Sequence, residues 1–241
     1  MADIVFILGF GILIALAVNF LSDTLPYGEY ARPCCHKCKA PIPILAYLSN
    51  KQCIRCQHRR SVRYFVIPLI SLSLVSVIRF HEPGIGWVLA IYAIIYFLIS
   101  AVIDWEHHII LSLLVVLGMV LGIIKAFYMF DYFSFLEGMA TGGILMGVTY
   151  LFGKLFVKIV RVQREGVESG IGFGDVLMGL VVGASCGWPN TVPALMVGFI
   201  LAGLISLMIL FIKVITKKYK PFEGVGFAPF MAIGALLFLL F

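Results

Sequence analysis

Long apolar segments dominate the chain and limit the folds that are open to it. Eight segments are rich enough in aliphatic and aromatic residues to be considered for crossing the ~30 Å hydrocarbon core of a bilayer. They lie near residues 4–21, 65–79, 85–103, 109–129, 133–157, 174–188, 191–215 and 225–241. With 62% hydrophobic and 12% charged residues, a soluble core of 241 residues could not bury this much apolar surface. The sequence therefore predicts an all-α polytopic membrane protein with about eight transmembrane helices.

Two of these segments, 65–79 and 174–188, are short for a bilayer core. A tilted or re-entrant path is therefore open for each of them. The first segment is not expected to be a cleaved signal peptide, because Met1-Ala2-Asp3 lacks a basic region and no small-residue cleavage site follows. We expect it to remain as a membrane anchor.

The positions of the lysines and arginines predict the orientation of the chain. Basic residues gather in the loop after the first segment, at the end of the fifth and at the end of the seventh, and these regions fall on one side of the membrane. Only Arg79 and Lys125 fall on the other side. The positive-inside rule makes the basic side cytoplasmic, which puts the N-terminus and, after an even number of segments, Phe241 outside.

The net charge of +6 is explained by this topology rather than by a nucleic-acid partner. A nucleic-acid-binding face would combine basic residues with interleaved aromatic residues or a known binding motif, and neither is found. The expected surroundings of the chain are therefore the lipid bilayer, with no nucleic acid.

Two aspartates lie at the ends of apolar segments. Asp104 follows Ile103 at the end of the third segment, and Asp175 closes Gly172-Phe173-Gly174-Asp175 at the start of the sixth. An ionisable group at such a position costs several kcal/mol unless it has a partner or a water-filled cavity, so each is a functional candidate. The predicted topology puts both on the cytoplasmic side, which indicates a site with two acids.

Each aspartate also has a simpler interpretation. Asp104 could be a solvated acid at the membrane surface, beside Glu106, His107 and His108. Asp175 could cap a helix, although the two glycines before it allow a backbone geometry and a close approach that an ordinary cap does not need. The two histidines are left out of the catalytic set, because histidines at a membrane surface are more often simply solvated.

The polar loop over residues 22–64 carries a second motif. Cys35-His36-Lys37-Cys38 and Cys53-Ile54-Arg55-Cys56 are two C-x-x-C pairs with a spacing close to that of tetrathiolate zinc ribbons. Four thiolates suit a structural Zn²⁺ ion, which would supply folding energy to a short loop. A reducing cytoplasm disfavours the alternatives of disulfides or redox use. Cys34 is a spare thiol or an alternative ligand, and Cys186 is expected to pack in an apolar segment.

These features divide the chain into a first transmembrane helix (1–21), a Cys-rich loop (22–64) and a transmembrane region that holds both aspartates (65–241). Together they resemble the bacterial type IV prepilin peptidases, which belong with the G-x-G-D membrane aspartyl proteases. Gly172-Phe173-Gly174-Asp175-Val176 and Ala101-Val102-Ile103-Asp104 are similar to the two catalytic motifs of that family. The paired cysteines match as well.

The similarity covers nearly the whole chain, in order. It extends through four further stretches, and these are Asn19 to Pro26, Ile42 to Leu48, Arg63-Tyr64, and Phe227 to Phe230. The chain departs from the family at three places, with Leu111-Ser112 in place of Pro-Asp or Pro-Asn, Pro68 in place of Glu, and Thr24 in place of Arg. Both aspartates and all four knuckle cysteines are kept.

The resemblance implies an endopeptidase that cleaves a type IV prepilin or pseudopilin, as used in type IV pili and type II secretion, after a glycine at the cytoplasmic membrane surface. It also implies that S-adenosylmethionine serves to methylate the new N-terminus in many members. Two close carboxyl groups cannot easily both ionise in an apolar site, so they share one proton, and one activates water while the other polarises the scissile carbonyl. Which aspartate begins as the base is not assigned.

Two other classes of function remain open at this stage. An ion or metal transporter would use Asp104 and Asp175 as coordinating groups, with the cysteine loop as a sensor. A noncatalytic scaffold of a pilus or secretion system would explain the altered Leu111-Ser112 segment. The lack of an internal repeat speaks against the transporter, and the presence of both aspartates speaks against the scaffold.

Overall fold

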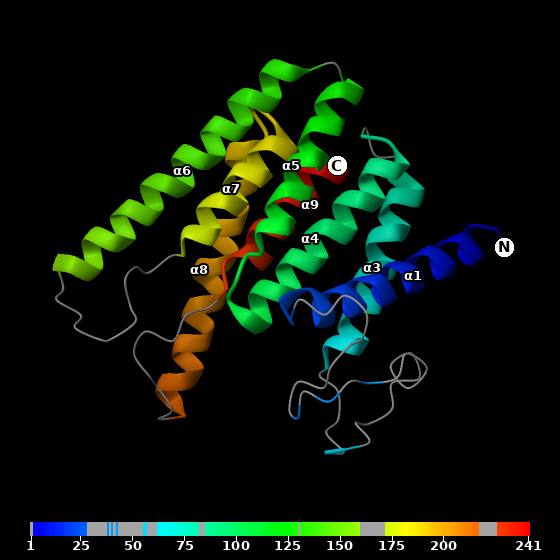
Figure 1. Cartoon of the computed structure of the whole chain (residues 1–241), viewed down its shortest axis with the longest axis horizontal. Helices are drawn as coiled ribbons and strands as arrows, with labels where there is room; N and C mark the ends of the chain where they lie inside the picture. Colours follow the sequence, from blue (N-terminus) through cyan, green and yellow to red (C-terminus); the bar gives the residue numbers. More distant parts are fainter. Residues whose placement is uncertain are drawn as a thin grey trace. The chain divides into compact units, whose positions relative to one another are not determined.

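The computed structural model is all-helical over the residues that it describes (Figure 1). Those residues are 2–27, 38, 40, 42, 55–56, 62–81, 85–129, 131–159, 172–216 and 226–241. Within them the elements are α1 (Ala2–Thr24), the 3-10 helix η1 (Leu25–Tyr27), α3 (Arg63–His81), α4 (Trp87–His107), α5 (Ser112–Met129), α6 (Tyr132–Ile159), α7 (Phe173–Cys186), α8 (Thr191–Ile215) and α9 (Ala228–Leu240). The predicted all-α membrane fold is confirmed.

Six of these helices are long and apolar enough to cross a membrane, and α7 and α9 are shorter. The short helix expected near 174–188 is confirmed as α7, which has 14 residues. The expectation of a short helix at 65–79 is wrong, because α3 continues through polar residues at both ends and reaches 19 residues. The other short helix is α9, with 13 residues, which begins only at Ala228.

By internal contacts the chain forms two compact units, residues 1–99 and 100–241. Their boundary falls inside α4, so the last two turns of that helix belong to the second unit. The division into 1–21, 22–64 and 65–241 followed hydropathy and composition rather than contacts, and it stays a prediction. Both aspartates of the predicted site lie in the second unit.

In the first unit, α1 packs along α3 (Figure 1). At their meeting ends, Arg63 donates to one carboxylate oxygen of Asp23, and the Tyr64 hydroxyl donates to the other. Arg63 also lies 3.2 Å from the Tyr64 hydroxyl oxygen. A buried ion pair whose charges are also hydrogen-bonded holds a specific geometry, and loss of one partner is costly. This cluster joins the two helices that flank the predicted cysteine loop.

In the second unit, α7 lies alongside α6 and also packs against α5, α8 and α9 (Figure 1). The contact with α6 is backbone to backbone: a Cβ on Gly183 would lie 2.1 Å from the Gly138 carbonyl oxygen, and one on Gly142 would lie 2.2 Å from the Gly179 carbonyl oxygen. Only glycine permits this approach. From Val181 to Cys186 every residue of α7 is buried. This helix is therefore an internal element of the unit, which explains how it can be short.

The two basic residues on the predicted external side both have structural partners. Arg79 pairs with Asp3 and lies over the Trp87 ring, 5.8 Å from its centroid, within the first unit. Lys125 donates to two backbone carbonyls of α7 in the second unit. The orientation itself stays a prediction, but both exceptions to the charge rule have a reason in the packing.

Candidate active site

Asp104 lies one turn before the end of α4 and is buried, with 5% of its surface exposed. Its Oδ2 accepts a hydrogen bond of 2.9 Å from the backbone N–H of Ala228, the first residue of α9. The N-terminus of a helix carries partial positive charge and unpaired N–H groups, so it stabilises a carboxylate there. The interpretation of Asp104 as a solvated surface acid is therefore wrong.

The segment that leads into α9 approaches Asp104 very closely. A Cβ on Gly226 would lie 2.5 Å from Asp104 Oδ2 and 2.9 Å from its backbone oxygen, so a larger residue would displace the acid. Pro229 stands in the first turn of α9, where a missing N–H costs little. The sequence did not identify Gly226 as part of the site. Its only signal was the family similarity of the residues just after it.

Asp175 is the third residue of α7 and is also buried, with 9% exposed. Its Oδ2 accepts a 3.1 Å hydrogen bond from the backbone N–H of Gly172, and its own N–H donates to the Gly172 carbonyl oxygen at 3.1 Å. This reciprocal arrangement is the acidic half of a capping box. The N-cap residue itself is Gly172, so the interpretation of Asp175 as the N-cap is wrong; Asp175 contacts the cap from the third helical position with one of its two carboxylate oxygens.

The structure brings the two aspartates together, as the sequence predicted. The negative charge of Asp104 acts directly on the Asp175 carboxyl group. Each acid is held through one oxygen by a backbone N–H at the start of a short helix, α9 for Asp104 and α7 for Asp175. The result is a buried pair of carboxyl groups with a charge repulsion between them. Their catalytic role stays a prediction.

The two glycines of the motif have different surroundings. Gly172 has φ −73° and ψ 152°, a backbone conformation open to any residue, and a Cβ there would lie at an ordinary 3.6 Å from Asp175. A Cβ on Gly174 would lie 3.1 Å from the Cβ of Ile110, in the turn between α4 and α5. The expectation that the glycines permit a close approach is therefore confirmed at Gly174 and wrong at Gly172.

Phe173 and the family departures can also be located. Phe173 is 61% exposed, and its ring lies 6.1 Å from that of Tyr150 in an edge-to-face arrangement. Ser112 is the first residue of α5, directly after the turn that carries Ile110, and Pro68 lies inside α3. Of the predicted zinc ligands, Cys38 and Cys56 are described, whereas Cys35 and Cys53 lie outside the described residues. The zinc prediction is therefore not tested.

Fold and site together define a polytopic helical membrane protein with a buried pair of aspartates. Residues 90–211, just over half of the chain, match the model of the type IV leader peptidase family, and the chain belongs to this family. It is also similar to the type 4 prepilin-like proteins leader peptide-processing enzyme of Escherichia coli O78:H11 (strain H10407 / ETEC). The two are 26% identical over 197 residues, which cover 81% of this chain and 68% of the relative. No solved structure matches the chain.

The surroundings of the two glycines predict different tolerance to the same substitution. Gly174→Val should destabilise the protein by about 1–3 kcal/mol, because its side chain would overlap Ile110. Gly172→Val should cost less than about 1 kcal/mol, since an N-cap residue with an ordinary backbone has room for it. Thermal unfolding of both variants in detergent measures the difference. Equal losses at the two positions would contradict the close contact at Gly174.

Proposed function

We propose that this protein is a membrane-embedded aspartyl endopeptidase that cleaves the leader peptide of type IV prepilins or pseudopilins. The observation that carries the proposal is the buried, mutually repelling pair Asp104 and Asp175 in a member of a leader peptidase family. The name of the E. coli relative, a leader peptide-processing enzyme for prepilin-like proteins, supports the substrate class. The proposed location is the inner membrane of a bacterium, with the aspartates facing the cytoplasm.

The hydrogen bonds at the pair leave each acid with one oxygen for chemistry. Oδ2 of Asp104 and Oδ2 of Asp175 accept backbone N–H groups, which fixes the orientation of both carboxyl groups. The Oδ1 atoms are then available to water and to the scissile peptide. Two close carboxyl groups in an apolar site share one proton, because ionising both would bring two negative charges together away from water.

The shared proton allows hydrolysis without a covalent intermediate. The ionised aspartate takes a proton from water, whose oxygen attacks the scissile carbonyl carbon, while the protonated aspartate donates a hydrogen bond to the carbonyl oxygen. As the tetrahedral intermediate collapses, the aspartate that took the proton from water donates it to the leaving nitrogen, which departs as an amine. The carboxyl pair returns to its singly protonated state, ready for a second turnover.

The proposed substrate has a short basic leader followed by an apolar helix, and the side chains near Asp175 suit the second part. Phe173 precedes the acid by two residues and is exposed, and Tyr150 lies against its ring. Such an aromatic surface can bind an apolar helix next to the cleavage point. The basic leader would lie on the cytoplasmic side of the predicted topology.

We further propose that Cys35, Cys38, Cys53 and Cys56 hold a structural Zn²⁺ ion. The support is the pairing and spacing of the four cysteines, whose thiolates are ligands that zinc prefers. The helices α1 and α3, which flank this loop, are joined by the ion pair of Asp23 and Arg63. Methylation of the new N-terminus with S-adenosylmethionine is a second proposed activity, and it rests on the family resemblance alone.

Removal of either acid should abolish cleavage. Asp104→Asn and Asp175→Asn each keep the size of the side chain but remove the ionisable group, so the pair can no longer hold and transfer its shared proton. We expect no detectable conversion of a co-expressed prepilin from the same genome, read as a mobility shift at equal membrane levels. Glu137→Gln, an exposed acid of α6, is the matched control and should cleave normally.

The results of this experiment separate the classes of function. Substantial cleavage by either aspartate variant would contradict the two-acid mechanism. A wild-type protein that cleaves no prepilin from its genome would favour the noncatalytic scaffold.

Zinc should be retained by the purified protein and depend on the loop cysteines. Cys35→Ser and Cys53→Ser should each lose most of the bound metal, because a structural site needs its full set of four ligands. Metal content by mass spectrometry of the detergent-purified protein measures this. Cys186→Ser is the matched control and should keep its zinc, since Cys186 lies buried in α7. Equal metal loss in all three variants would contradict a zinc site in the loop.

Methylation should be visible on the cleaved product. With S-adenosylmethionine present, mass spectrometry of the mature N-terminal peptide should find a single added methyl group. The Asp104→Asn variant should transfer none to intact prepilin, because the acceptor amine is created by cleavage. A fully cleaved but unmethylated product would restrict the protein to the peptidase activity.

A further inference from the structure

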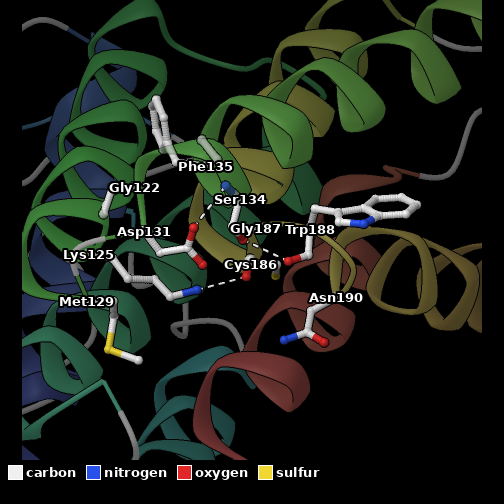
Figure 2. Close-up of a pocket in the computed structure, with 12 residues that line it drawn as sticks. Gly122, Lys125, Met129, Asp131, Ser134, Phe135, Cys186, Gly187, Trp188 and Asn190 are labelled. Atoms are coloured by element: carbon white, nitrogen blue, oxygen red, sulfur yellow. Dashed lines mark hydrogen bonds between the residues drawn. The ribbon is translucent and has the colours of Figure 1, made fainter.

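The end of α7 opposite to Asp175 is held by a side chain from another helix. Lys125 of α5 directs its ammonium group to the last turn of α7 and donates hydrogen bonds of 2.8 Å to the carbonyl oxygens of Ser185 and Cys186. Figure 2 shows the bond to Cys186. The last carbonyls of a helix have no partner within the helix, and in apolar surroundings each unpaired one is costly. Lys125 therefore pairs the last two carbonyl oxygens of α7, which the backbone cap at Gly187 does not reach.

The cap is one of several hydrogen bonds that hold the end of α7 around Gly187. The Gly187 N–H donates to the Gly183 carbonyl oxygen at 2.8 Å, and Gly187 itself has φ 75°, a conformation that favours glycine. Directly after it, the Trp188 N–H donates to the Ser134 carbonyl oxygen, and the Ser134 hydroxyl donates to the Trp188 carbonyl oxygen, at 2.9 and 2.7 Å. The far end of α7 is thus tied to α5 by Lys125 and to α6 by Ser134.

The residues that make these hydrogen bonds line a cavity of about 180 Å³ (Figure 2). Its wall includes Lys125, Asp131, Ser134 and Asn190. Asp131 accepts the Ser134 N–H at 3.1 Å and is the acid whose charge acts on Lys125. Lys125 supplies the positive charge in this cavity, and its ammonium donates to the carbonyl oxygen of Cys186 in the cavity wall.

The position of the last turn of α7 affects the position of Asp175 at the other end of the same helix. The 14 residues of α7 span about 20 Å, and backbone contacts with α6 at Gly179 and Gly183 support the helix between its two ends. An axial shift or a tilt of the last turn would therefore move the first turn, where Asp175 meets Asp104. Catalytic groups are sensitive to such displacement, and an error of 1 Å can cost about 10²-fold in rate.

We propose that Lys125 is a positioning residue of the peptidase, which sets the place of Asp175 by capping the opposite end of α7. This inference rests on the proposed function. It also gives a functional reason for one of the two basic residues on the predicted external side. Lys125 lies there because α7, the helix that carries Asp175, ends on that side.

The test compares Lys125→Met with Lys125→Arg in the full-length protein. Met keeps the length and apolar packing of the side chain but donates no hydrogen bond, so we expect kcat for prepilin cleavage to fall by about 10²-fold with KM unchanged. Arg keeps charge and donors and should recover most of the rate. Lys158→Met is the matched control: it makes the same substitution at an exposed lysine in the last turn of α6, leaves the end of α7 unchanged, and should cleave normally.

Two readouts separate positioning from a loss of folded protein. A smaller active fraction lowers kcat at every pH equally, whereas a displaced Asp175 weakens the repulsion within the pair and moves the alkaline limb of the pH–rate profile to lower pH. Independently of activity, Cys186 is 2% exposed and lies in the capped turn. Its alkylation by N-ethylmaleimide, quantified on the Cys186 peptide, should be faster in Lys125→Met and slow in Lys125→Arg.

The inference is overturned if the wild type cleaves and Lys125→Met matches it in kcat, or if Cys186 stays as protected in that variant as in the wild type. It is also overturned if Lys158→Met loses as much activity as Lys125→Met, since the loss would then follow from removing a lysine rather than from removing the cap of α7. Failure of the wild type to cleave would instead count against the proposed function, and the alkylation comparison would still decide whether Lys125 holds α7.

Discussion

The arrangement of the second unit depends on two hydrogen bonds between carboxylates and the first backbone N–H groups of short helices. Asp104 accepts from Ala228 at the start of α9, and Asp175 accepts from Gly172 just before α7. An acid in apolar surroundings needs such a partner. The first bond joins the end of α4 to the start of α9, and the second fixes the Asp175 carboxylate within the first turn of α7. The two helices too short for an ordinary membrane span both meet the acid pair at their first turns, because α7 carries Asp175 and α9 donates a hydrogen bond to Asp104 of α4.

The shortness of α7 has consequences at its other end. A helix of 14 residues surrounded by α5, α6, α8 and α9 ends inside the unit, where its last carbonyls cannot all reach water. Lys125 donates hydrogen bonds to the carbonyl oxygens of Ser185 and Cys186. The Gly187 N–H and the Ser134 hydroxyl make further hydrogen bonds at the same end. The end that carries Asp175 and the end that Lys125 caps are thus the two ends of one short helix. In our proposal Lys125, although it lies at the other end of α7, helps to position Asp175.

The same physical rule explains the few ionic groups elsewhere. Asp23, Arg63 and Tyr64 satisfy one another where α1 meets α3, and Arg79 pairs with Asp3. In a chain with 12% charged residues, a charge in or near an apolar segment is expected to have a specific partner. The two arginines and Lys125 follow this rule. Charges without such partners are expected in the polar loops, where water is available.

The sequence by itself determined the helical membrane fold, the approximate span ends and the identity of both aspartates, because apolar length and a rare ionisable residue are local signals. It identified α7 as short but marked α3 in place of α9 as the other short helix, since α3 extends through polar residues and α9 starts late, at Ala228. Nor did it indicate Gly226, Ile110 or Lys125 as supports of the site. Those roles come from contacts between residues more than sixty positions apart or from different helices, such as Gly226 with Asp104 and Lys125 with Cys186. Only packing in three dimensions decides such contacts, because nothing in a local pattern records which distant backbone a side chain will meet.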